Sequence, residues 1–207
     1  TDNAYVQAAR VAISTSVTWR IVKIHVSENQ RVKAGDVLFT LDKANPQADL
    51  AQNEAALASA KARVSGLQAE YRGKLLGVSA AQERLQYAQS ELTRTRELGA
   101  EGIASKQQVE SAEHAVQQAH ADLSAARQAA SAALASLGGD PSVSVDDHPA
   151  VTEAAARLER ARLALSYTEV IAPESGTVTK VEQVQVGTFV NAGQTLFWLV
   201  SGSPWIE

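Results

Sequence analysis

The chain has 207 residues, a formal net charge of −4 at pH 7 and no cysteine. Nucleic-acid-binding domains normally carry a basic patch, so the acidic balance argues against that class. The missing thiols exclude disulfides and thiolate chemistry, and no run of 18 apolar residues is present to span a membrane. Of the 38 alanines, 30 lie between Pro46 and Thr168, which favours packed helices there. Because there is no methionine, we expect a processed chain or an excised fragment.

Two segments with strand character, residues 11–45 and 169–202, flank the alanine-rich region. Each contains alternating apolar and polar residues, as in IVKIHV and VLFTLD. The stretch RVKAGDVLFTL (31–41) matches FVNAGQTLFWL (189–199) at a constant offset of 158, which aligns Gly35 with Gly193. We expect these glycines in tight turns with positive φ. Since a short hairpin is marginal alone, the two halves are expected to close on each other as one small β-sandwich.

Residues 46–168 carry an apolar repeat of seven residues. The repeating positions are Leu50, Leu57, Val64, Tyr71, Val78, Leu85 and Leu92, then Val109, Val116, Leu123, Ala130 and Leu137, then Val151, Leu158 and Leu165. This pattern predicts a left-handed coiled coil. Gly99 and Gly102 are expected to end the first helix, and Ser105 to be the N-cap of the second. The short connection, with its tip at 99–104, predicts an antiparallel hairpin roughly 80 Å long.

The second arm of this hairpin contains an interruption. The first helix is expected at 46–98, and the return at 105–137 and 150–168, so that the two arms have nearly equal lengths of 53 and 52 residues. The stretch GGDPSVSVDDHP (138–149) is therefore expected to loop out, opposite the weak helical sequence around Gly66. The predicted fold class is α+β, with a long helical hairpin inserted into a split β-sandwich.

The split repeat resembles the biotinyl/lipoyl-type domain of the membrane fusion proteins, the periplasmic adaptors of the HlyD family. The stretches TDNAYVQA, LDKANPQADLAQNEAALASAKA and APESGTVTKVEQVQVGTFVNAGQ are similar to the EmrA-type subfamily. The resemblance covers essentially the whole chain and implies a non-enzymatic adaptor without cofactors. It implies a link between an inner-membrane drug transporter, of the major facilitator type, and a TolC-type outer-membrane channel. It also implies the periplasm of a Gram-negative bacterium, an N-terminal inner-membrane anchor upstream of Thr1 and self-association into a ring.

Family adaptors that meet TolC-type channels carry an Arg, a Leu and a Ser at the hairpin tip, with three residues between the Arg and the Leu and six between the Leu and the Ser. Arg94, Leu98 and Ser105 fit this spacing. The resemblance therefore implies that these three residues contact the channel, through a five-donor guanidinium, an apolar side chain and a hydroxyl. The alternative is that Arg94 and Arg96 are ordinary solvated residues of a coiled coil.

Two features depart from the family pattern. Family members continue into a β-barrel, so residues 1–10 and 203–207 are expected to be stubs of that barrel. Trp19 stands where the second half has Gly176, which predicts either a different turn or a tryptophan that covers the sandwich edge.

Several other residue patterns have simpler interpretations. Lys43 in TLDKA resembles the modified lysine of lipoyl or biotin carriers, but the helical insertion that begins there favours a linker lysine. His114 and His120 are six residues apart, so they do not share a helix face as metal ligands would. Asp146, Asp147 and His148 are expected in a surface turn, and no nucleophile–base pair or phosphate loop indicates an enzyme. The competing functions are an adaptor for type I protein secretion, a lipoyl or biotin carrier subunit, and a coiled-coil scaffold without a transport role.

Overall fold

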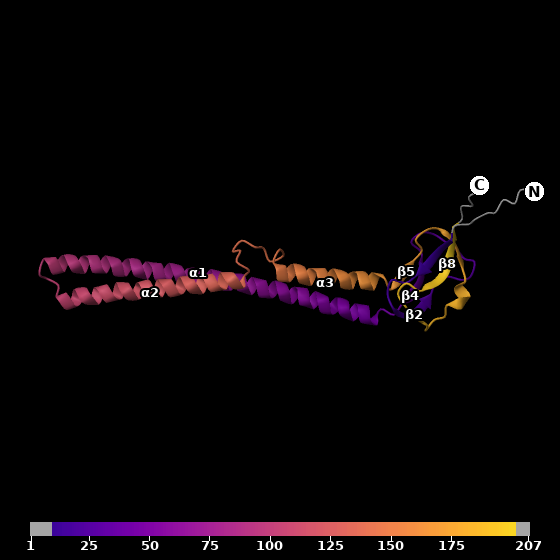
Figure 1. The fold of residues 1–207 in the computed structure, drawn as a ribbon, viewed down its shortest axis with the longest axis horizontal. Helices are drawn as coiled ribbons and strands as arrows, with labels where there is room; N and C mark the ends of the chain where they lie inside the picture. Colours follow the sequence, from indigo (N-terminus) through magenta and orange to yellow (C-terminus); the bar gives the residue numbers. More distant parts are fainter. Residues whose placement is uncertain (1–9, 202–207) are drawn as a thin grey trace, which may run out of the picture. The chain divides into compact units, whose positions relative to one another are not determined.

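The computed structural model describes residues 10–201, which form two compact units. Residues 57–153 make up a helical unit, and the described residues on either side of them make up a unit that contains the β-sandwich (Figure 1). The barrel stubs expected at 1–10 and 203–207 lie outside the described residues, apart from Arg10, which begins a strand. Within residues 10–201, no helix combines the length and the apolar character that crossing a bilayer would need.

The sandwich consists of two four-stranded sheets, with the strand orders β1-β8-β6-β3 and β5-β4-β2-β7. The strands are β1 (Arg10–Ser14), β2 (Trp19–Ile24), β3 (Arg31–Val32), β4 (Val37–Leu41), β5 (Glu169–Ile171), β6 (Gly176–Thr179), β7 (Phe189–Val190) and β8 (Thr195–Ser201). In each sheet the two central strands come from one half of the sequence and the two edge strands from the other. Neither half can therefore complete a sheet alone, and the prediction of a split sandwich is confirmed.

The two tight turns of the repeat are held in the same way. Gly35 has φ +91° and Gly193 has φ +79°, which confirms the prediction of left-handed turns. The N–H of Gly35 donates to the carbonyl of Ala172, and the N–H of Gly193 donates to the carbonyl of Thr15, both at 2.8 Å. Each of these hydrogen bonds joins one half of the sequence to the other, so the sequence repeat is also a repeat in the hydrogen bonding.

Inward-facing residues of both halves build the sandwich core. The repeat-matched pairs Val32/Val190, Leu38/Leu196 and Leu41/Leu199 are all buried. Phe39 and Phe197 meet edge to face, with ring centroids 5.7 Å apart. Each large apolar side chain contributes roughly 1.5–3 kcal/mol through burial, so this shared core joins segments separated by the whole hairpin.

The difference between Trp19 and Gly176 has a steric reason. A Cβ at position 176 would lie 2.5 Å from the carbonyl oxygen of Val200, so strand β6 accepts no side chain there. Trp19 begins β2, pairs with Val190 of β7 and packs half-buried against the core. The indole of Trp19 therefore contributes to the sandwich core from strand β2.

Three helices make up the insertion, namely α1 (Ala44–Ala100), α2 (Lys106–Ser136) and α3 (Pro149–Ser166). Their buried residues lie at the predicted heptad positions or three residues after them. The buried members are Val64, Ala81, Leu85, Ala119, Leu123, Ala130, Ala133, Leu137, Val151, Ala154, Leu158 and Ala161. Helix α1 begins two residues before Pro46, because the Asp42 carboxylate accepts a hydrogen bond from the Ala44 N–H at 2.9 Å, and the proline then occupies the first turn.

The segment between α2 and α3 folds onto α1. Val143 and Val145 pack against a buried cluster that contains Val64. The side-chain amide of Gln68 donates to the carbonyl of Val143 at 2.9 Å, and Lys61 Nζ lies 2.7 Å from Asp146. The interruption therefore lies beside the part of α1 around Gly66, as expected, but it packs against that helix and does not simply loop out, and Asp146 serves as an ion-pair partner.

Candidate functional site

The chain reverses at the hairpin tip through a Schellman turn. Gly102 has φ +75°, its N–H donates to the carbonyl of Gly99 at 3.1 Å, and the Ile103 N–H donates to the carbonyl of Leu98 at 2.9 Å. This pair of hydrogen bonds is the signature of a helix that ends on a left-handed glycine. Gly102 therefore ends α1 as expected, but Gly99 does not. Gly99 lies inside the last turn, where a Cβ would lie 3.3 Å from a methyl group of Val109.

Ser105 begins the second helix. Its hydroxyl oxygen accepts a hydrogen bond from the Gln108 N–H at 3.3 Å, and its own N–H donates to the Gln108 side chain at 2.7 Å. These two bonds form a capping box, so the predicted N-cap is confirmed. The oxygen already accepts one hydrogen bond within the helix, so this exposed hydroxyl keeps its proton and one lone pair for a partner.

Arg94 lies on the exposed side of α1, with 67% of its side chain accessible. Its guanidinium donates a hydrogen bond to the carboxylate of Glu91, one helical turn earlier. This bond and the charge of Glu91 raise the pKa of Arg94 above its ordinary value. Arg96 instead reaches Glu113 of α2 at 2.7 Å, so the two nearby arginines have different partners.

Arg94 and Leu98 line one groove near the tip. The groove has a volume of about 550 Å³ and lies between α1, which supplies Glu91, and the start of α2, which supplies Gln108. Ala104, Ala112 and Ala115 also line it, so small side chains leave room between the helices. Ser105 is not among the lining residues. The structure therefore brings two of the three predicted contact residues into one groove and gives the third a separate role as a cap.

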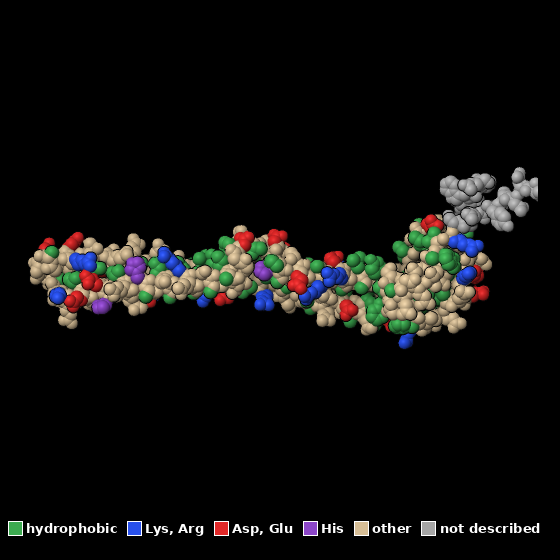
Figure 2. All heavy atoms as spheres, viewed as in Figure 1, with side chains coloured by type: hydrophobic (Ala, Val, Ile, Leu, Met, Phe, Trp, Pro, Cys, Tyr) green, Lys and Arg blue, Asp and Glu red, His purple; other side chains and the backbone are tan. Residues whose placement is uncertain are grey.

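Apolar side chains remain exposed at this end of the hairpin. Leu98 is 36% exposed and Ile103, in the turn itself, is 69% exposed. Figure 2 shows acidic and basic side chains intermixed near this end, at the left of the view. The arrangement combines a cation, an apolar pair and a groove, which suits the docking of a surface with carbonyl or carboxylate acceptors and an apolar hollow.

Three residues of the tip were not predicted from the sequence, although two of them carry a signal. Gln108 completes the S-x-x-Q pattern of a capping box. Glu91 precedes Arg94 by three residues, a spacing that places side chains together on a helix. Ile103 gives no such signal, because only the turn geometry shows that it stays exposed.

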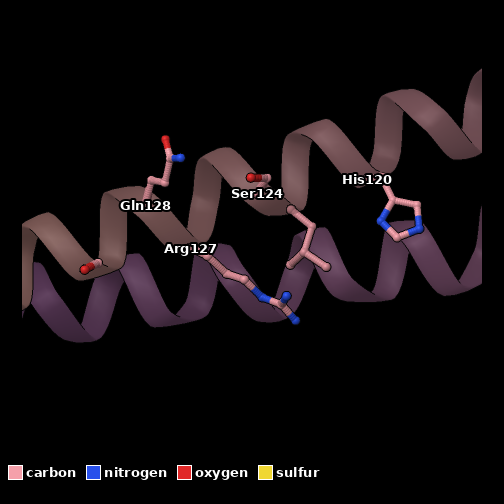
Figure 3. Close-up of a pocket in the computed structure, with 6 residues that line it drawn as sticks. His120, Ser124, Arg127 and Gln128 are labelled. Carbon is pink, nitrogen blue, oxygen red and sulfur yellow. The ribbon is translucent and has the colours of Figure 1, made fainter.

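A second hollow, of about 320 Å³, lies along α2 between His120 and Ser131 (Figure 3). In this view Gln128 and Arg127 extend in opposite directions from the helix. Among residues 10–201, no three His, Cys, Asp or Glu side chains gather closely enough to hold a metal ion. The hollow is lined by Leu123 together with polar side chains, and these do not form such a metal-binding group.

Lys43 lies next to the start of α1, and its Nζ is 2.5 Å from Glu169 of β5. This pair joins the segment that enters the hairpin to the segment that leaves it. The hydrogen bond and charge of Lys43, with a smaller effect of the His25 charge, lower the pKa of Glu169. Lys43 thus has an ion-pair partner beside a helix, whereas a carrier lysine stands on a tight turn between strands.

Residues 44–168, more than half of the chain, match the family described as the EmrA alpha-helical hairpin domain. The chain belongs to the EmrA-type membrane fusion proteins of the HlyD family. Members of this family are adaptors and not enzymes.

The EmrA-type chain resembles two curated proteins along its whole length. It is 35% identical over 213 residues to the multidrug resistance protein MdtN of Escherichia coli O157:H7, covering 99% of the chain and 60% of that protein. It is 31% identical over 208 residues to the multidrug export protein EmrA of Haemophilus influenzae, covering 100% of the chain and 52% of that protein. The chain therefore spans between half and two thirds of the length of these relatives.

The fold is also similar to a solved structure, that of the periplasmic adaptor protein EmrA. The TM-score is 0.50 with 18% sequence identity, and the match covers 97% of this chain and 74% of that chain. At this identity the likeness concerns the fold alone. It agrees with the α+β architecture of a helical hairpin inserted into a β-domain.

Proposed function

We propose that this EmrA-type chain is part of a periplasmic adaptor in a tripartite drug-efflux pump. The adaptor joins an inner-membrane transporter of the major facilitator type to a TolC-type outer-membrane channel in a Gram-negative bacterium. The tip of the hairpin, with Arg94, Leu98 and Ser105, is the end that meets the channel. An N-terminal anchor holds the protein at the inner membrane.

The groove at the tip is the observation that carries this proposal. It places the guanidinium of Arg94 beside the apolar side chain of Leu98, at the end of a hairpin whose family match and whose relatives' names concern multidrug export. A partner with carbonyl or carboxylate acceptors next to an apolar hollow would satisfy both groups.

Self-association into a ring belongs to the same proposal. Residues 46–168 then act as the docking arm, and the sandwich halves, 11–45 and 169–202, pack side by side with those of neighbouring copies. Exposed apolar side chains on the helices, such as Leu76 at 73% and Tyr87 at 72%, have no cover within the hairpin. Burying them against neighbouring copies would stabilise such a ring.

The test uses the absence of cysteine in the chain. A single cysteine replaces Glu101, which is exposed in the tip turn, because a cysteine at Ser105 would remove the helix cap. Cross-linking is measured in cells between this position and cysteines at the periplasmic mouth of the channel, using the adaptor with its anchor and barrel. Gln89→Cys, roughly 18 Å further down α1, is the position control.

Two charge variants sharpen the result. Arg94→Asp is expected to abolish the cross-link from position 101, whereas Arg96→Asp, whose arginine pairs with Glu113, is expected to retain it. Cross-linking at 101 and not at 89, with this difference between the arginines, supports docking through the tip. A strong cross-link at 89 with none at 101, in cells that still export drugs, would contradict it.

A further inference from the structure

The outer face of the sheet β1-β8-β6-β3 carries a hollow that lies in the sandwich unit. It has a volume of about 330 Å³ and is lined by Arg10, Thr179, Lys180, Trp198 and Val200. Strand pairing places Trp198 between Ala12 of β1 and Thr179 of β6. Because both neighbours are small, the indole is left half-exposed on the outside of the sheet. Trp198 and Val200 therefore provide an apolar floor.

A cation stands on each side of this floor. Arg10 lies on β1, directly opposite Val200 of β8, and Lys180 follows the last residue of β6. Within residues 10–201, neither side chain forms an ion pair. Among the described residues, two exposed cations therefore flank an apolar surface without forming an ion pair with a carboxylate.

Lys180 has a strained backbone. Its φ is +66°, a left-handed conformation that is unfavourable for any residue with a Cβ. Glu28 holds this turn, since one carboxylate oxygen accepts the Lys180 N–H at 2.9 Å and the other accepts the Val181 N–H at 2.7 Å. Strained residues of this kind concentrate at binding sites, so a lysine kept here at a cost in stability points to a role for its side chain.

The internal repeat provides a comparison within the same molecule. On the other sheet, the position equivalent to Trp198 is Thr40, and the position equivalent to Val200 is Asp42. The hydroxyl of Thr40 is hydrogen-bonded to the ring of His25 at 2.9 Å. The two equivalent positions thus carry polar side chains, so the apolar floor is a property of the residues at 198 and 200 and not of the sandwich fold.

We propose that this hollow binds a small organic anion with an apolar body, such as a monocarboxylate with an acyl or aromatic group. The apolar body would lie on Trp198 and Val200, and the carboxylate would accept charge-assisted hydrogen bonds from Arg10 or Lys180. The volume is at the lower end of the range of small-molecule sites. The inference goes beyond the proposed docking function, because it needs neither the hairpin tip nor a channel.

Binding is measured on the purified chain by calorimetry and by the shifts of backbone amide and indole resonances. The probes are decanoate and 2-naphthoate, with decanol as the neutral match for decanoate. We expect both anions to shift signals of β1, β6, β8 and the Trp198 indole, and decanol to bind more weakly. Arg10→Gln and Lys180→Gly are each expected to weaken binding of the anions roughly three- to tenfold. Trp198→Thr, which introduces the residue found at the equivalent position 40, should weaken the binding of both anions further.

Lys180→Gly is a useful variant because glycine accepts the left-handed turn without strain, so lost binding cannot be attributed to unfolding. Upstream of the matched stretch, IVKIHV aligns with VTKVEQ at an offset of 157, which sets Lys23 on the other sheet against Lys180. Lys23→Gln is therefore the matched control and should leave binding unchanged. Equal binding of decanol and decanoate would overturn the proposal. It would also be overturned if Lys23→Gln weakened the binding of the anions as much as Lys180→Gly does. Binding only to vesicles of phosphatidylglycerol, with no response to the free anions, would overturn it in favour of a membrane surface.

Discussion

Arg94 and Glu91 form an ion pair one turn apart on α1, so the guanidinium at the hairpin tip is already held by a carboxylate of its own helix. Both side chains line the groove at the tip. In the proposed docking, a partner would either use the remaining donors of Arg94 or displace Glu91 from the guanidinium. Glu91 would then influence how readily the arginine binds the channel, a role that the tip motif of Arg, Leu and Ser does not include.

We expect Glu91→Gln to strengthen docking about two- to fivefold, because the amide competes less well than a carboxylate for the guanidinium. The measurement is the yield of cross-linking from position 101 to the channel at limiting channel levels. Glu97→Gln, an exposed glutamate on the same helix that does not line the groove, should leave the yield unchanged. Weaker docking of Glu91→Gln would show instead that the carboxylate itself contacts the partner.

Ser105 offers a way to separate capping from contact. We expect Ser105→Ala to lower the free energy of unfolding by about 1 kcal/mol, because the N-cap acceptor is lost. Ser105→Asp should retain the stability, since aspartate is an equally good N-cap. Urea unfolding followed by circular dichroism measures both changes.

The same two variants test the family-implied contact. If the hydroxyl donates to the channel, Ser105→Asp should fold normally and yet give a reduced cross-link from position 101. Normal docking of Ser105→Asp, together with a lower free energy of unfolding of Ser105→Ala, would mean that this serine acts only as a helix cap.

Replacement of glycine by alanine is expected to have opposite effects on the stability of the two units. A Cβ at Gly77 meets no atom within 4 Å, so Gly77→Ala should stabilise α1 by about 0.5–1 kcal/mol through helix propensity. Gly176→Ala should destabilise the sandwich by about 1–3 kcal/mol, because the added methyl group would overlap the Val200 carbonyl. Thermal unfolding followed by circular dichroism measures both changes. A loss of stability in Gly77→Ala would contradict the first prediction and point to a need for flexibility at that position.

Most of the fold could be predicted from local patterns in the sequence. The heptads identified the seam that buries Val64, Leu85 and Leu123, because a period of seven directly reflects which face of a helix is covered. The repeat aligned Gly35 with Gly193, whose turns share one hydrogen-bonding scheme. Exchange of edge strands between the halves was not predicted, because a sequence match shows which segments are alike and not which strands pair.

The candidate site was less predictable, because its details depend on contacts that spacing does not report. The sequence indicated a helix end at Gly99. The close approach of the Val109 side chain explains better why this position has a glycine. The pairing of Arg96 with Glu113 depends on the register between two helices, which no single-helix pattern fixes. Lys43 and Glu169 are separated by the entire hairpin, so only the closed sandwich shows that they meet.

That ion pair leads to a prediction about pH. Lys43 lowers the pKa of Glu169 below its ordinary value of 4.5, so the unfolded chain binds the proton more tightly than the folded one. The stabilisation by the charged carboxylate is therefore fully present above pH 4.5 and is lost as the pH falls through the lowered pKa. We expect Glu169→Gln to have a slightly lower Tm than the wild type at about pH 7, and the difference to shrink as the pH falls below 4.5.

The measurement is the Tm of both proteins across this range. Glu159→Gln is the matched control, since Glu159 also forms an exposed ion pair, with Arg162, one turn apart on α3. This variant removes an ion pair within a single helix, so it measures how much of the change in Tm is common to the loss of any exposed, paired carboxylate. A Tm difference for Glu169→Gln that grows on acidification would mean that the charged carboxylate destabilises the fold, and that the contact with Lys43 does not hold the two ends of the hairpin together.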